Sequence, residues 1–125
     1  MAENFPVYVV DDDEAVRDSL SLLLTCSGFA VQNFASARDF LEYCGGRSDG
    51  CLIFDLHMPE MSGAQMLRHL RADGNSIVAI AISGKRDQAT DAELKRDGAF
   101  AVLSKPFDDE QFLALIRKVL ETLRP

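Results

Sequence analysis

Short apolar segments recur along the chain and alternate with longer, mixed segments. They occupy residues 7–10, 30–34, 51–54, 77–82 and 100–103. Segments of this length that are rich in β-branched and aromatic residues are typical of strands, and the wholly apolar ones are typical of strands buried on both faces. The pattern therefore predicts five strands, and the longest apolar run, at 77–82, predicts the most buried of them.

The mixed segments carry apolar residues three and four positions apart, which is the spacing of one helix face. We expect helices at 14–27, at 37–44, between Ser62 and Gly74, at 87–97, and between Asp108 and Leu123. The residues placed to cap helix N-termini are Ser36, Ser62 and Asp108, and Gln65 completes a capping box with Ser62. The glycines placed to end helices are Gly28, Gly74 and Gly98.

The last two predicted helices differ most in their apolar faces. The final helix places Phe112, Leu115, Ile116, Val119, Leu120 and Leu123 on one face. The helix at 87–97 offers little beyond Ala89, Ala92 and Leu94. Because a helix with little buried area lies at the low-stability end of a domain, we expect the helix at 87–97 to shift easily.

Strands that alternate with helices predict an α/β fold, in which helices cover both faces of a parallel sheet. The 125 residues fit one doubly wound domain over 1–125, and 47% hydrophobic with 26% charged residues is an ordinary globular composition. The sequence contains no internal repeat, linker or low-complexity tract. We therefore expect no second domain in this chain.

The net charge of −7 disfavours nucleic-acid binding, which depends on Lys and Arg, and suits a bound cation or a basic partner. Cys26, Cys44 and Cys51 form no metal or disulfide motif, so we expect small core residues in a reducing compartment. The first residues lack signal-peptide features, and no apolar stretch approaches membrane-spanning length. Together these features predict a cytoplasmic protein without membrane contact.

Polar side chains follow four of the five predicted strands. Asp11, Asp12 and Asp13 follow the first strand, Asp55 the third, Ser83 the fourth and Lys105 the fifth. Ligands of open parallel sheets bind outside the carboxyl ends of the strands, so these groups should share one edge. Clustered carboxylates repel each other unless a hard cation such as Mg²⁺ binds between them. Lysine and hydroxyl groups beside them suit phosphate oxygens, so the set predicts a phosphoryl-transfer site.

Each of these residues also has a simpler interpretation. An Asp triplet after a strand is usually a solvated turn, and for Asp13 we prefer a helix cap. Asp55 alone fits a turn before Pro59, and a single Ser83 or Lys105 fits an ordinary loop or surface residue. Only the joint placement of these residues at strand ends favours a phosphoryl-transfer site over these simpler interpretations.

Four segments together resemble the response-regulator receiver family of two-component signalling, and most of all receivers of helix-turn-helix-bearing regulators. They are Val9-Val10-Asp11-Asp12-Asp13, Asp55-Leu56-His57-Met58-Pro59 with Met61-Ser62-Gly63, Ser83-Gly84, and Lys105-Pro106-Phe107. The resemblance covers essentially the whole chain. It implies a flavodoxin-like (βα)5 fold with strand order 2-1-3-4-5.

The resemblance also implies residue roles. Asp55 is the expected phosphoryl acceptor; Asp11, Asp12, Asp55 and the backbone carbonyl of His57 are the expected Mg²⁺ ligands; Ser83, Gly84 and Lys105 are the expected phosphoryl-binding and switch residues. The Lys105–Pro106 peptide is expected to be cis, which is rare except before Pro. His57 and Lys85 occupy variable positions beside the phosphoryl group that are expected to tune its hydrolysis.

The expected function is a phosphorelay switch that catalyses only its own phosphorylation and hydrolysis, and is otherwise not an enzyme. The implied partners are a sensor histidine kinase or phosphotransfer protein, and an output domain or target protein. The implied output face comprises the helix at 87–97 and the strand and helix that follow, and its use in a homodimer on phosphorylation is a further expectation. The family often has Tyr or Phe three residues before its lysine, whereas this chain has Val102.

Two alternatives remain open. A metal-dependent phosphatase could use the same acidic edge, although the sequence offers no obvious acid, base or substrate pocket for it. P-loop and dinucleotide sites are disfavoured because neither glycine pattern follows a strand. Within the receiver family, the chain fits both a single-domain regulator and the receiver part of a longer DNA-binding regulator.

Overall fold

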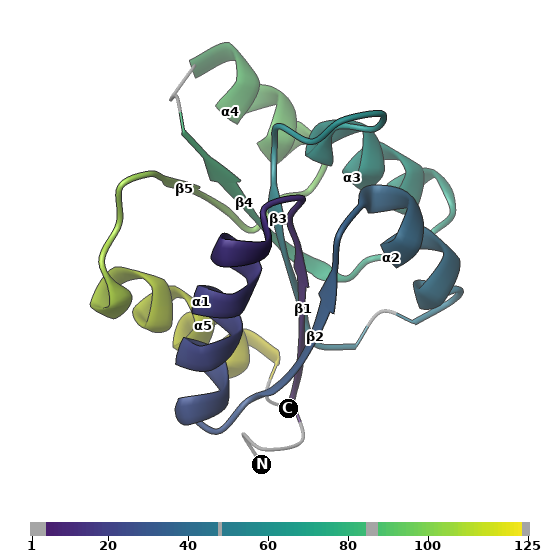
Figure 1. Cartoon of the computed structure of the whole chain (residues 1–125). Coiled ribbons are helices and arrows are strands. Elements are labelled where there is room, and N and C mark those ends of the chain that lie inside the picture. Colours follow the sequence, from purple (N-terminus) through teal and green to yellow (C-terminus); the bar gives the residue numbers. More distant parts are fainter. Residues whose placement is uncertain (1–4, 48, 85–87, 124–125) are drawn as a thin grey trace.

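The computed structural model describes residues 5–47, 49–84 and 88–123. Five parallel strands form one sheet in the order β2-β1-β3-β4-β5 (Figure 1). The strands are β1 Pro6–Val10, β2 Ala30–Phe34, β3 Cys51–Asp55, β4 Val78–Ser83 and β5 Ala101–Ser104. This confirms the predicted α/β class and the strand order that the resemblance implied, and each strand lies within one residue of its predicted bounds.

The helices are α1 Glu14–Cys26, α2 Ala37–Cys44, α3 Gly63–Ala72, α4 Gln88–Arg96 and α5 Asp109–Leu123. Figure 1 shows α1 and α5 on one face of the sheet and α2, α3 and α4 on the other. Alternation along β1 divides the core in the same way. Tyr8 and Val10 belong to the cluster beneath α2 and α3, whereas Val7 and Val9 belong to the cluster beneath α1 and α5. The sheet is therefore covered on both faces, as expected for parallel strands.

Side chains cap the helices as the sequence predicts. The Asp13 carboxylate accepts the N–H groups of Ala15 and Val16 and so caps α1. Ser36 accepts the Asp39 N–H at the start of α2. The capping boxes are formed by Ser62 with Gln65 and by Asp108 with Gln111. These caps satisfy N–H groups that have no partner within the helix, and they fix where each strand-to-helix loop ends.

Two predictions about individual side chains are wrong. Cys26 is exposed and not a core residue, because it lies two positions, about 200° around the helix, from Leu24, which faces the sheet. Leu123 is 44% exposed, while Leu113, which the pattern left out, is buried. Leu123 is the last residue of α5, one turn beyond Val119, where the core cluster ends.

The thiols are free and differ strongly in their surroundings. Cys44 and Cys51 are buried, and burial raises the pKa of both thiols, that of Cys51 to about 12. Since the thiolate is the reactive form, a raised pKa suppresses reaction near pH 8. We expect only Cys26 to react rapidly with Ellman's reagent in the native protein, and all three cysteines to react after unfolding. The Cys26→Ser variant should lose the rapid phase; a second rapid thiol would contradict this assignment.

Hydrogen bonds from Arg71 of α3 hold the C-terminal end of α4 in place. Its guanidinium donates to the backbone carbonyls of Asn75, Ile77, Asp97 and Gly98, at 2.9 to 3.0 Å. Leu94 of α4 is also fully buried. Among the described side chains of α4, at 91–96, Leu94 alone is buried, and Ala89 lies outside them. The end of this helix is held by polar contacts that the sequence did not reveal.

Candidate functional site

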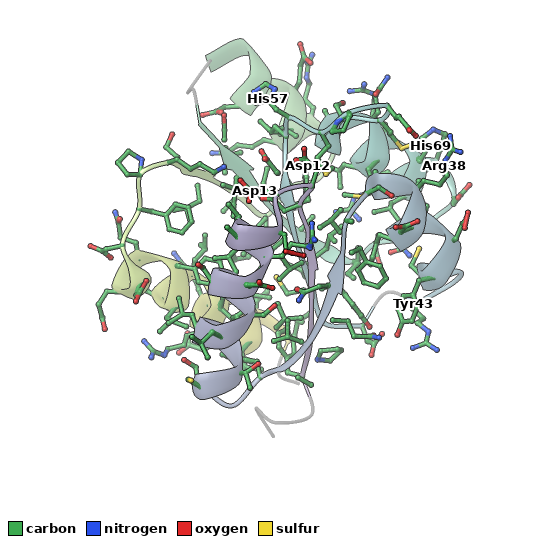
Figure 2. All side chains as sticks on the ribbon, in the orientation of Figure 1. Asp12, Asp13, Arg38, Tyr43, His57 and His69 are labelled. Atoms are coloured by element: carbon green, nitrogen blue, oxygen red, sulfur yellow. The ribbon has the colours of Figure 1, made fainter. Side chains whose placement is uncertain are left out.

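The predicted acidic group forms at the carboxyl edge of the sheet. Strand β1 ends at Val10 and strand β3 at Asp55. The carboxylates of Asp11, Asp12 and Asp55 each place an oxygen within 4.8 Å of the others. Asp13 points elsewhere, because its side chain caps α1. Figure 2 shows Asp12 and His57 at this edge, whereas His69 lies away from it over α3.

Asp11 is the most buried member of the acidic group, with 2% of its surface exposed. Burial raises the pKa of its carboxyl group, the Asp13 N–H donated to Oδ1 at 2.9 Å lowers that pKa, and the charge of Asp55 raises it again. Burial and the neighbouring negative charge thus both act against the ionised form of Asp11. A positive ion between these carboxylates would relieve both the burial cost and the repulsion.

Asp55 lies between the acidic pair and a lysine. Lys105 Nζ is 3.8 Å from Asp55 Oδ2, and the His57 N–H donates to Asp55 Oδ1 at 3.2 Å. Lys105 itself is fixed from the neighbouring strand, because its N–H donates to the Ser83 carbonyl at 2.8 Å. The Lys105–Pro106 peptide is cis, the isomer that the resemblance implies. One oxygen of the largely buried Asp55 carboxylate thus faces an ammonium group.

Ser83 ends β4 beside Asp55. Asp55 pairs with Ile82 across the sheet, so Ser83 lies one residue beyond that partner, and it is buried. Gly84 follows and is exposed, and a Cβ added there would meet nothing within 4 Å. This open surface leaves room for a group bound at Asp55. Lys85 lies outside the described residues.

The donor set fits magnesium. Mg²⁺ prefers oxygen ligands and commonly uses one or two carboxylates together with a phosphate. The acidic group supplies three carboxylates from the ends of β1 and β3, while Ser83 ends β4 and Lys105 follows β5. Among the residues 5–47, 49–84 and 88–123, this is the one such group of potential metal ligands.

The loop after Asp55 packs tightly against the site. The Gly63 N–H donates to the Leu56 carbonyl at 3.0 Å. A Cβ at Gly63 would come closer than 3.0 Å to the Phe54 ring and to the Asp55 carbonyl oxygen. The preceding turn is also constrained, since Glu60 has φ = +68° and the Met61 N–H donates to the Pro59 carbonyl at 2.8 Å. Glycine at 63 is therefore required by close packing rather than by an unusual dihedral angle.

The prediction from the sequence did not include Arg17, which contacts the loop of Asp11, Asp12 and Asp13 after β1, called the acidic loop below. Arg17 of α1 donates from Nη1 to the backbone carbonyl of Asp11 at 2.6 Å. A signal was available, because Arg17 lies four residues after the helix cap Asp13 and so on the same side of the helix.

Comparison with known proteins gives a consistent result. A family model described as "Response regulator receiver domain" matches residues 7–117. The transcriptional regulatory protein FixJ of Azorhizobium caulinodans is 41% identical over 120 residues, covering 96% of this chain and 57% of FixJ. The response regulator protein TmoT of Ectopseudomonas mendocina is 42% identical over 115 residues, covering 92% of this chain and 52% of TmoT. The chain thus spans about half the length of these curated relatives.

Solved structures agree with the sequence comparison. The crystal structure of FixJ-N superposes with a TM-score of 0.88 at 38% identity and covers 98% of both chains. Full-length FixJ from B. japonicum gives a TM-score of 0.88 at 34% identity, with 98% of this chain and 60% of that chain covered. In the part of the chain that the structure describes, no helix is both long and apolar enough to cross a membrane.

Proposed function

The chain belongs to the response regulator receiver domain family, and from this premise we propose that Asp55 accepts a phosphoryl group from a sensor histidine kinase or a phosphotransfer protein. The observation that carries the proposal is the position of the Asp55 carboxylate, between the acidic pair Asp11 and Asp12 and the ammonium group of Lys105, 3.8 Å away. A buried carboxylate with a potential cation site on one side and an ammonium group on the other suits a nucleophile that becomes a charged acyl phosphate.

In the proposed reaction, an Asp55 carboxylate oxygen attacks phosphorus and forms the new P–O bond. The P–N bond of the donor phosphohistidine breaks, and its electron pair leaves with the imidazole. Lys105 pairs with a phosphoryl oxygen, and the Ser83 hydroxyl donates to another. The lack of a side chain at Gly84 leaves access for the donor. The exposed side chain of His57 influences the later entry of water.

Mg²⁺ is the proposed cofactor, with Asp11, Asp12, Asp55 and the backbone carbonyl of His57 as its protein ligands. When bound, it neutralises charge on the phosphoryl oxygens. Asp11 supports this assignment because its carboxylate is buried and lies within 4.8 Å of the carboxylates of Asp12 and Asp55. The domain catalyses only its own phosphorylation and dephosphorylation in this proposal.

The proposed output face comprises α4, β5 and α5. Movement of Ser83 toward the phosphoryl group would shift the population of α4 positions. Val102 is a small buried residue on β5, so we infer that this switch works without an aromatic side chain at that position.

The proposed recipients are a target protein or the output domain of a longer protein. FixJ is named as a transcriptional regulator, and transcription regulation is the corresponding proposal here. The free thiols suit the reducing cytoplasm that we propose as its location.

The proposal is tested by intact mass spectrometry after incubation with acetyl phosphate. We expect the mass to increase by one phosphoryl group with Mg²⁺ present, and not when EDTA removes the cation. An unchanged mass with Mg²⁺ would contradict phosphoryl acceptance. Steady turnover of phosphorylated small molecules, without a covalent intermediate, would favour the metal-dependent phosphatase.

A further inference from the structure

Arg17 is anchored at both ends beside the acidic loop. Its backbone N–H donates to the Asp13 carbonyl at 3.0 Å, within the first turn of α1. Its guanidinium turns back and donates from Nη1 to the Asp11 carbonyl at 2.6 Å. The side chain is half-buried. A short, charge-assisted hydrogen bond of this kind restricts its acceptor more firmly than a bond between neutral groups.

The other polar groups of Asp11 are also engaged. Its N–H donates to the Phe34 carbonyl at 3.1 Å, and its Oδ1 accepts the Asp13 N–H at 2.9 Å. Three groups of Asp11 are thus fixed from different places. Strand β2 holds the N–H, Arg17 of helix α1 holds the carbonyl, and the loop itself holds Oδ1. The other carboxylate oxygen, Oδ2, takes no part in these contacts, and the carboxylate lies within reach of those of Asp12 and Asp55.

The Asp11 carbonyl has a particular position in the chain. It belongs to the planar peptide unit that joins Asp11 to Asp12. A donor on this carbonyl therefore limits rotation of the whole unit and sets the direction in which both side chains leave the backbone. Asp12 is exposed, and among the described residues its carboxylate accepts no hydrogen bond, so the orientation of the peptide plane is one of the few restraints on it.

We propose that Arg17 is a positioning residue for magnesium: it holds the peptide between Asp11 and Asp12 so that their carboxylates converge with that of Asp55. This inference rests on the proposed function. It assigns Arg17 no contact with the cation or the phosphoryl group.

The charge of Arg17 makes the proposal sharply testable. The guanidinium on the Asp11 carbonyl adds positive charge beside the acidic loop. Positive charge opposes cation binding, so loss of that charge alone should strengthen Mg²⁺ binding. Loss of positioning should weaken Mg²⁺ binding. The two effects change the Kd for Mg²⁺ in opposite directions. A higher Kd in the Arg17 variant indicates a positioning role, and a lower Kd indicates a purely electrostatic one.

The experiment is a calorimetric titration of Mg²⁺ into the parent, Arg17→Met and Arg117→Met at neutral pH. Met keeps an apolar stem and removes every donor. Arg117 is an exposed arginine on α5, so its replacement gives the same change in net charge away from the acidic loop. Residues that orient metal ligands typically change metal affinity 10- to 100-fold, and we expect the Kd of Arg17→Met to rise about 10-fold while that of Arg117→Met stays near the parent value.

Arg17→Lys provides a second variant that keeps the charge, and its Kd should lie between those of the parent and Arg17→Met. Thermal melting without Mg²⁺ identifies any variant that fails to fold; if Arg17→Met does not fold, Arg17→Lys carries the comparison and must still bind Mg²⁺ more weakly than the parent. Equal or tighter binding by the folded Arg17 variant would overturn the inference alone. A parent that binds no Mg²⁺ would overturn the proposed magnesium site and this inference with it.

Discussion

The Asp55→Asn variant is expected to take up no phosphoryl group from acetyl phosphate, whereas the parent gains one. An amide has no anionic oxygen to attack phosphorus, so the loss should be complete and not a reduced rate. The substitution preserves side-chain size, and the amide oxygen can still accept the His57 N–H that now reaches Asp55 at 3.2 Å. Intact mass spectrometry in the presence of Mg²⁺ provides the measurement.

Asp13→Asn is the matched control for this variant. It makes the same change in charge on the same edge of the sheet, but Asp13 caps α1 and does not join the acidic group. Asn caps helices about as well as Asp, so Asp13→Asn should still gain one phosphoryl group. Uptake by Asp55→Asn at the parent level would show that another residue is the acceptor.

Gly63→Ala is expected to lower the free energy of unfolding by about 3 kcal/mol, at the upper end of what overpacking usually costs. The added methyl group would meet the Phe54 ring and the Asp55 carbonyl oxygen. The ring could turn, but the carbonyl belongs to a central strand and has little freedom to move. Helix propensity alone favours Ala by about 1 kcal/mol, so destabilisation would identify the clash as its cause. Urea unfolding provides the measurement.

Gly46→Ala is the control for this second variant. Gly46 is exposed, and a Cβ there would meet nothing within 4 Å. We expect its free energy of unfolding to stay within about 1 kcal/mol of the parent value. Equal stabilities for Gly63→Ala and Gly46→Ala would show that the loop after Asp55 yields to the methyl group.

Local patterns predicted most of the fold. The strands and helices followed from apolar spacing, and the caps at Asp13, Ser36 and Ser62 followed from residue type, because both signals act within a few residues. The strand order did not follow from them. Five parallel strands allow several orders, and the order 2-1-3-4-5 came from the resemblance before the structure confirmed it.

The acidic group was predicted because strand ends of a parallel sheet share one edge, whatever the order of the strands. The contacts of Arg17 and Arg71 were not predicted. Both side chains bind backbone carbonyls, which every residue carries, so no partner can be identified by its residue type. The requirement for glycine at 63 depends on packing against Phe54 and was likewise invisible in the local pattern.

The strands that carry the site differ in how firmly the sheet holds them. Asp11 and Asp55 adjoin β1 and β3, which have a strand on each side, whereas Lys105 follows the edge strand β5, which pairs with β4 alone. A strand paired on one side only has fewer backbone hydrogen bonds to break, so its local opening costs less free energy than that of a central strand. Fraying of β5 would withdraw the ammonium group while the carboxylates stay in place. If the proposed function holds, the group that pairs with the phosphoryl oxygens would be lost before the groups that bind Mg²⁺. In that partly opened state the domain would be expected to bind Mg²⁺ but not to hold a phosphoryl group.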